Sequence, residues 1–208
     1  MVTANVKLSK NELELVCGAS FILTKNNIIA KVYQLFGDLQ PGFVLENERL
    51  HTLLPSEVFA PSPKIYKGEQ YQGLPYVMLD TPRYFGKEGA FAIRCFFWWG
   101  NFFSISLQLS GKYAMDYAEK MIMQMASKQY DDWYICVNED HWQHHFEETN
   151  FLPFNAASVE AYRNLKSDQV PFFKIACKIP LTKWEEASDF FNDKYSCLID
   201  LATECIGC

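Results

Sequence analysis

A two-residue alternation of apolar and polar side chains around one short turn constrains the fold of this chain most strongly. Every second residue is apolar from Phe91 to Phe97 and again from Phe103 to Leu109. Successive side chains of a β-strand point to opposite faces of the sheet, so both segments are predicted to be strands with one apolar face. A three-residue turn, Trp99-Gly100-Asn101, pairs Phe97 with Phe103 and keeps the apolar side chains on one face, whereas a two-residue turn mixes the faces. We therefore predict an antiparallel hairpin with a three-residue turn.

The same segment raises the question of a membrane span. Residues 90–109 contain one charged residue, Arg94, and about 20 residues are enough to cross a bilayer as a helix. A membrane-spanning helix does not alternate with period two, and the polar turn lies in the middle of the segment. We therefore expect two strands here and no membrane partner.

Local signals predict the other elements. Ser9 and Glu12 form a capping-box pattern that starts a helix at Lys10, and Thr182 with Glu185 repeats this pattern before a long last helix. Gly37 is expected to end the second helix. Further helices are expected at residues 26–36, 112–128, 141–148 and 158–166, and strands at residues 57–60, 64–66, 76–80, 132–138 and 172–179.

The order of these elements predicts the fold class. Helices come first, strands follow, and strands then alternate with helices. We expect an α+β fold in two layers, with a mainly antiparallel sheet and helices packed on one face. The length of 208 residues fits a single domain, residues 1–208. Within it, a helical part (1–37) and a turn-rich connection (38–75) precede the sheet and its helices (76–208).

Composition excludes several classes of protein. Apolar residues make up 49% of the chain and charged residues 21%, which argues against intrinsic disorder. The formal net charge of −6 leaves no basic field for phosphate backbones, so no nucleic-acid partner is expected. No apolar signal segment follows Met1, and the count of seven cysteines is odd, so we expect a cytoplasmic protein. Glycine-rich phosphate loops are missing, and no cofactor is expected.

The first candidate site combines arginine with aromatic side chains. It consists of Arg83, Tyr84, Arg94, Trp98 and Trp99. A guanidinium among aromatic rings suits an anionic or planar ligand, through bidentate hydrogen bonds and stacking, and such surfaces also bind proteins. We expect a small anionic or aromatic ligand, or a protein partner such as a second copy in a homodimer. A solvated sheet face is the structural alternative.

The second candidate site is the cluster His141, His144 and His145. On a helix, His141 and His145 lie one turn apart on one face, and two imidazoles at this spacing can share a divalent metal. The alternative function is therefore that of a metal-dependent, hydrolase-like enzyme. The competing interpretation is a solvated polar helix face, with Trp142 and Phe146 directed inward. These patterns leave open whether the protein is an enzyme.

Two cysteines end the chain, in the order Cys205-Ile206-Gly207-Cys208. A redox-active pair normally lies at a helix N-terminus, where the helix dipole lowers the thiol pKa, whereas this pair follows a helix. The same four residues also resemble a C-terminal lipidation motif. Their last residue is not a usual one for that motif, and no polybasic stretch precedes them. We expect a frayed, inert tail.

The C-terminal part resembles a known family in the order of its elements. The likeness is carried by Asp131-Asp132-Trp133-Tyr134-Ile135-Cys136-Val137, by Phe172-Phe173-Lys174-Ile175-Ala176 and by the helix from Trp184 to Leu201. In this layout the chain resembles the uncharacterised bacterial YktB-like family. That resemblance implies an α+β fold and a cytoplasmic protein. It brings no catalytic residues, because the function of the family is itself unknown.

Overall fold

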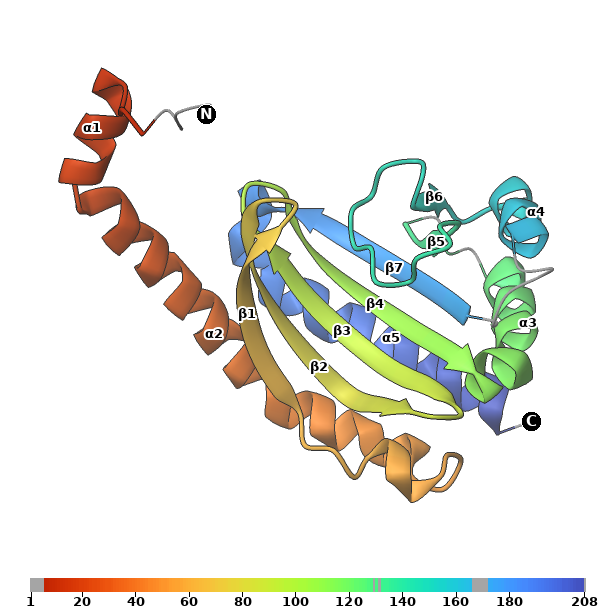
Figure 1. Ribbon diagram of the computed structural model, residues 1–208. Helices are drawn as coiled ribbons and strands as arrows, with labels where there is room; N and C mark the ends of the chain where they lie inside the picture. Colours follow the sequence, from red (N-terminus) through yellow and green to blue (C-terminus); the bar gives the residue numbers. More distant parts are fainter. Residues whose placement is uncertain (1–5, 129, 131, 166–171, 208) are drawn as a thin grey trace.

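A computed structural model of the chain describes residues 6–128, 130, 132–165 and 172–207 (Figure 1). Within these residues, seven strands form one sheet in the order β1-β2-β3-β4-β7-β5-β6, and each pairing is antiparallel. The strands are β1 (Lys64–Tyr71), β2 (Leu74–Gly86), β3 (Gly89–Trp98), β4 (Phe102–Gly111), β5 (Tyr134–Cys136), β6 (Phe151–Pro153) and β7 (Phe172–Pro180). The helices are α1 (Lys10–Cys17), α2 (Ser20–Asn47), α3 (Lys112–Ser127), α4 (Ala156–Leu165) and α5 (Ala187–Ile206), with 3₁₀ segments η1 (Glu48–Leu50), η2 (Ser56–Val58) and η3 (Leu181–Glu186).

The sheet forms one layer and the helices form the other. Figure 1 shows α2 and α5 running across the same face of the sheet, and α3 contacts β3, β4 and β7. Buried side chains of α2, α3, α4 and α5 share one apolar core with the facing side of the strands. The predicted α+β fold, with a mainly antiparallel sheet and helices on one face, is confirmed.

The central hairpin is confirmed together with its register. β3 and β4 pair Phe97 with Phe103 across a turn at residues 99–101. Gly100 has a φ of +73° in this turn, a left-handed conformation that glycine adopts without strain. The apolar rows of both strands therefore lie on the helix-covered face, where they form the middle of the core.

Helix α2 is longer than its local signals indicate. The prediction that Gly37 ends it is wrong, because the helix continues through Gly37 and Pro41 to Asn47. Burial of a large apolar side chain contributes about 1.5–3 kcal/mol. Several such contributions outweigh the local helix penalties of about 1 kcal/mol for glycine and about 3 kcal/mol for proline. The buried face of α2 consists of Ile29, Val32, Phe36, Leu39, Phe43 and Asn47.

The two predicted capping boxes have different outcomes. At α1, the Ser9 hydroxyl accepts from the Glu12 N–H at 3.3 Å, and the Glu12 carboxylate accepts from the Ser9 N–H at 2.7 Å, as predicted. The second capping box is wrong, because Thr182 and Glu185 lie in η3 and α5 begins at Ala187. Lys183, which lies between them, has a φ of −101° and a ψ of 39°, outside the range of an α-helix. One continuous helix therefore cannot start at Thr182.

The segment predicted as a turn-rich connection contains regular structure. Residues 38–75 include the end of α2, both η1 and η2, and strand β1. The predicted strand at residues 57–60 is wrong, since η2 occupies this position. Pro55, Pro61 and Pro63 remove backbone donors on either side of it, which prevents a strand ladder.

Tyr195 connects α5 to α2 and to the sheet. Its ring stacks on Phe43, with ring centroids 3.8 Å apart. Its fully buried hydroxyl lies 2.7 Å from the carbonyl oxygen of Thr81 and 2.7 Å from the side-chain oxygen of Asn47. Because a buried hydroxyl is costly without hydrogen bonds, these contacts fix how the two helices lie over β2.

We expect Tyr195→Phe to lower the free energy of unfolding by about 1–3 kcal/mol, because it keeps the ring and leaves buried polar partners without the hydroxyl. Urea denaturation followed by circular dichroism measures the change. Tyr117→Phe, at a half-buried position on α3, is the control and should change stability little. Equal losses in the two variants would contradict the role of the Tyr195 hydroxyl.

Candidate functional site

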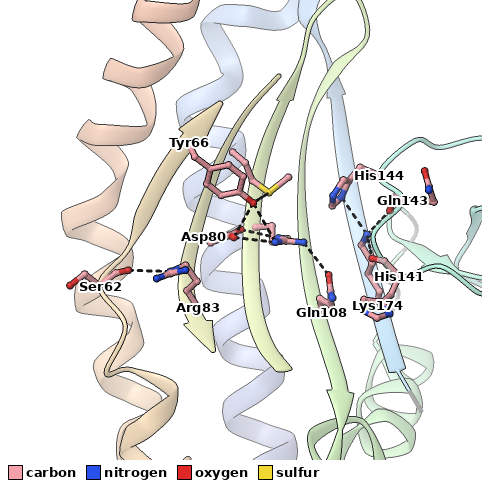
Figure 2. Close-up of polar contacts among 11 residues, drawn as sticks. Ser62, Tyr66, Asp80, Arg83, Gln108, His141, Gln143, His144 and Lys174 are labelled. Atoms are coloured by element: carbon pink, nitrogen blue, oxygen red, sulfur yellow. Dashed lines mark hydrogen bonds and ion pairs between the residues drawn. The ribbon is translucent and has the colours of Figure 1, made fainter. Parts of the chain in front are cut away.

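The face of the sheet opposite the helices carries a row of polar side chains from five adjacent strands. We call them the polar row: Tyr66 on β1, Asp80 on β2, Arg94 on β3, Gln108 on β4 and Lys174 on β7. Figure 2 shows Tyr66, Asp80, Gln108 and Lys174 following one another across the strands. Residues 137–150 join β5 to β6 and cover the polar row, where they contact Arg94 and Lys174. We call these residues the covering segment.

Arg94 and Asp80 form a buried ion pair at the centre of the row. The two residues are cross-strand partners, and both are almost completely buried. Arg94 Nε donates to Asp80 Oδ1 at 2.9 Å, and Nη2 donates to Oδ2 at 3.1 Å. Burial opposes the arginine charge, but Asp80 overcomes this effect and raises the pKa of Arg94. The guanidinium is therefore permanently charged and already neutralised by a carboxylate.

Two aromatic rings cover the guanidinium of Arg94. Its central carbon lies 5.3 Å from the ring centroid of Phe85 and 5.1 Å from that of Trp142 in the covering segment. The two rings are 5.8 Å apart and are themselves partly exposed. Arg94 is therefore separated from solvent by a cation–π contact on its outer side.

Gln108 and Lys174 continue the row toward β7. Arg94 Nη1 donates to Gln108 Oε1 at 3.4 Å, whereas the buried Nε2 of Gln108 finds no acceptor within the described part of the chain. Gln108 is the cross-strand partner of Lys174, which is fully buried. Lys174 Nζ donates to the carbonyl oxygens of Gln143 at 2.6 Å and His141 at 3.0 Å. This lysine thus ties the covering segment to the sheet.

The electrostatic setting of Lys174 differs from that of Arg94. Burial lowers the pKa of Lys174 to about 7, because the ammonium group loses its hydration, and the nearby charge of Arg94 acts in the same direction. The contacts of the amine are carbonyl oxygens rather than a carboxylate. The amine therefore changes its charge near neutral pH.

His144 lies next to this amine. Its pKa is well below the usual value, because the partly buried ring loses hydration and because the charges of Lys174 and Arg94 disfavour another cation. His144 is therefore neutral at pH 7, and its Nδ1 lies 3.4 Å from Lys174 Nζ. Since an ammonium group has no acceptor, Nδ1 accepts the hydrogen bond whenever Lys174 is protonated.

Tyr71 at the end of β1 holds the other side of the covering segment. Its hydroxyl oxygen accepts from the backbone N–H groups of His144 at 2.6 Å and His145 at 3.0 Å. Its ring contacts Trp98 and Phe96 edge to face, at 5.0 Å and 5.6 Å between centroids. The covering segment is thus fixed by side chains of β1 and β7 rather than by regular structure of its own.

The structure separates the five residues of the arginine–aromatic prediction. Arg94 and Trp98 lie on the face of the polar row, and Arg83 lies on the same face, where its Nε donates to the Ser62 carbonyl oxygen at 3.4 Å (Figure 2). Tyr84 and Trp99 pack against the apolar core on the helix-covered face. The side chains of β2 alternate in direction, so neighbours along the strand cannot share a surface.

The predicted helix at residues 141–148 is wrong, because this part of the chain is irregular. The Asn138 side chain accepts from the Asp140 N–H at 2.8 Å, and the Asp140 side chain accepts from the Trp142 N–H at 2.9 Å. Such local side-chain hydrogen bonds compete with helix formation.

The predicted metal site depends on this helix. His141 and His145 do not share a helix face, so their spacing does not support a shared metal. In residues 6–128, 130, 132–165 and 172–207, no group of three or more histidine, cysteine, aspartate or glutamate side chains is arranged to hold a metal.

Sequence reasoning missed Lys174 as a site residue. Its signal is a single lysine inside the apolar run from Phe172 to Ala176. The C-terminal prediction is also corrected at Cys205, which is buried in α5 rather than part of a frayed tail. Cys208 lies outside the described residues.

Comparisons with known proteins identify no relative of this chain. No family model matches the chain, and searches of curated proteins and of solved structures also find no match. The resemblance to the YktB-like family therefore stays a prediction. Within the described residues, no single helix has both the length and the apolar character to cross a membrane, although α1 taken together with residues 20–50 passes this test as a pair bent by 58°.

We expect the stability difference between the wild type and Lys174→Met to depend on pH. The pKa of Lys174 is about 7 in the folded protein and has its ordinary value of 10.5 in the unfolded chain, so the unfolded state binds more protons between these values. The free energy of unfolding of the wild type should therefore rise relative to the variant by about 1.4 kcal/mol per pH unit above pH 7.

Urea denaturation at pH 6, 7, 8 and 9 measures this difference. The exposed Lys183 provides the control variant Lys183→Met, for which the difference should not change with pH. A pH-independent difference for Lys174→Met would contradict the buried, titrating amine.

We expect Asp80→Ala to destabilise the protein by about 3–5 kcal/mol, because it leaves the charge of Arg94 buried without a partner. The double variant Asp80→Leu with Arg94→Met removes both charges and should recover most of this loss. Thermal and urea denaturation compare the two. A double variant as unstable as the single one would show that the ion pair does not carry the effect.

Proposed function

We propose that this protein binds a small anion beneath the covering segment, between Gln108 and Lys174. The observation that supports this proposal most is a buried positive charge without a carboxylate partner, next to a buried donor without an acceptor. The ammonium group of Lys174 has no carboxylate within ion-pair distance among the described residues, and Gln108 Nε2 has no acceptor there. Arg94 differs from Lys174, because the carboxylate of Asp80 neutralises its charge.

An anion at this position would receive hydrogen bonds from two directions. Gln108 and Lys174 are direct cross-strand partners on one face, so their Cβ atoms lie about 5 Å apart. A charge-assisted hydrogen bond from an ammonium group is stronger than one between neutral groups. The anion would replace the backbone carbonyl oxygens of His141 and Gln143, which now accept from Lys174. Binding therefore involves local displacement of the covering segment.

Protonation would be coupled to binding. Lys174 has a pKa of about 7 without an anion, and a bound anion raises it, because an opposite charge favours the protonated form. Binding is therefore strongest below pH 7 and weakens as the pH rises. The protein would act as a binding protein rather than an enzyme. We propose the cytoplasm as its compartment, in line with Cys95 and Cys177, which form no disulfide among the described residues.

Sulfate and benzoate are suitable probes for isothermal titration calorimetry, because neither changes its charge between pH 6 and 8. We expect the affinity to fall about tenfold between these pH values, as the free amine loses its proton. Lys174→Met should abolish binding at pH 6, since methionine keeps the length of the side chain without the charge. Lys178→Met, at an exposed position on the same strand, should leave binding intact.

Two outcomes would contradict the proposal. One is no heat of binding with either anion at pH 6. The other is equal binding by the wild type and Lys174→Met. The Lys174 variant is expected to fold, because an apolar side chain replaces a buried charge.

A further inference from the structure

The amine of Lys174 lies among acceptors. Its Nζ contacts the carbonyl oxygens of Gln143 at 2.6 Å and His141 at 3.0 Å, and Nδ1 of His144 at 3.4 Å (Figure 2). An ammonium group has one hydrogen for each of these contacts, whereas a neutral amine has two hydrogens and a lone pair. When Lys174 loses its proton, we expect the longest contact, to His144, to be released. The lone pair of a buried nucleophile is then free to react.

The charges around Lys174 leave much of it neutral at physiological pH. Cys136 on β5 and Asp140 in the covering segment favour the ammonium form, and Arg94 on β3, paired with Asp80 on β2, disfavours it. Burial has the largest effect and lowers the pKa to about 7. At pH 7.5 about three quarters of the molecules therefore carry a neutral amine here, against about one in a thousand for an ordinary lysine.

A buried donor without an acceptor lies beside this amine. Gln108 is the cross-strand partner of Lys174 and is fully buried. Its Oε1 accepts from Arg94, which fixes Nε2 as the free end of the amide, and Nε2 finds no acceptor within the described part of the chain. A negatively charged group formed on Lys174 would meet this donor and the nearby charge of Arg94. The surroundings therefore favour conversion of the amine into an anion.

The covering segment limits which reagent reaches the amine. Lys174 is fully buried, and the hydrogen bonds of Lys174 and Tyr71 hold the segment over it. An aldehyde or ketone with substituents would have to displace the segment in order to react. Carbon dioxide is uncharged, linear and small, so it gives up little hydration on burial and needs only a local opening. It is the electrophile that fits this position.

We propose that Lys174 is a carbamylation site, at which carbon dioxide adds to the buried amine and forms a lysine carbamate. A bond forms between Nζ and the carbon of carbon dioxide, and the electron pair of one C=O bond moves to its oxygen. The proton that leaves the nitrogen passes to Nδ1 of His144.

The product makes this proton transfer favourable. Before the reaction, the charge of Lys174 is one cause of the low pKa of His144. After it, the same side chain is an anion and favours a protonated imidazole. The carbamate oxygens can then accept from Nδ1–H of His144 and from Nε2 of Gln108, the donor that has no acceptor in the unmodified protein. The reaction therefore satisfies a buried group rather than creating an unsatisfied one.

This inference goes beyond the proposed anion site and does not depend on it. Both use Lys174 and Gln108, but a free anion binds the ammonium form, whereas carbon dioxide reacts with the neutral amine. The two events exclude each other and have opposite pH dependence, since anion binding is strongest below pH 7 and carbamate formation is favoured above it. Carbon dioxide would therefore regulate anion binding.

Nuclear magnetic resonance of the full-length protein with ¹³C-bicarbonate, which supplies labelled carbon dioxide, tests the proposal. At pH 7.5 we expect a carbamate resonance in the wild type that is absent in Lys174→Met and retained in Lys178→Met, at an exposed position on the same strand. The α-amino group of the chain, with a pKa of about 8, also forms a carbamate and provides a reference signal in every sample. At pH 6 and equal dissolved carbon dioxide, the Lys174 resonance should fall severalfold, because the ammonium form then predominates.

Chemical trapping locates the carbamate without a variant. Triethyloxonium ion converts a carbamate into a stable ethyl ester, and peptide mass spectrometry of the wild type should find a ¹³C-labelled ethoxycarbonyl group on Lys174. A wild type with no carbamate besides that of the α-amino group would overturn the inference, and so would an unchanged spectrum in Lys174→Met.

Sulfate calorimetry at pH 6 separates the two proposals. A heat of sulfate binding without a Lys174 carbamate would overturn this inference and support the anion site. A Lys174 carbamate without a heat of binding would support this inference and count against the anion site alone.

Discussion

A guanidinium charge at the centre of the sheet determines how the face opposite the helices is arranged. Removing an arginine from water costs several kcal/mol unless a carboxylate and further acceptors surround it. Arg94 meets this requirement through Asp80, the side-chain oxygen of Gln108, and the rings of Phe85 and Trp142. These partners belong to β2, β4 and the covering segment. The three parts of the structure therefore depend on one another, although they are far apart in the chain.

The second cation of this face has a different balance of charge. Arg94 has a carboxylate partner, whereas the amine of Lys174 has backbone carbonyl oxygens and a neutral imidazole around it. Burial can therefore lower the pKa of the lysine to about 7, while the arginine stays charged. When the amine loses its proton it can still donate to these carbonyl oxygens, but the hydrogen bonds are then no longer charge-assisted. This difference between two neighbouring cations is the physical basis of the proposed anion site.

The candidate site was predictable in part. Arg94 stands out as the only charge in an alternating strand, and Trp98 follows on the same face two residues after Phe96. Tyr84 and Trp99 pack against the apolar core instead of joining Arg94, because closeness along the chain does not place side chains on one surface. The spacing of His141 and His145 matches one face of a helix. The side chains of Asn138 and Asp140 instead accept hydrogen bonds from nearby backbone N–H groups, which competes with helix formation. Lys174 became a site residue only through the pairing of β4 with β7.

The sequence by itself determined the α+β class, the register of the β3–β4 hairpin and the capping box at Ser9. Each of these depends on side-chain alternation or on hydrogen bonds between residues close in the chain, so local patterns suffice. Only the tertiary structure decided the length of α2, the polar row and the path of the covering segment. Their stability comes from burial against residues that the sequence separates by many positions. In α2, that burial outweighs the preferences of Gly37 and Pro41 for ending a helix.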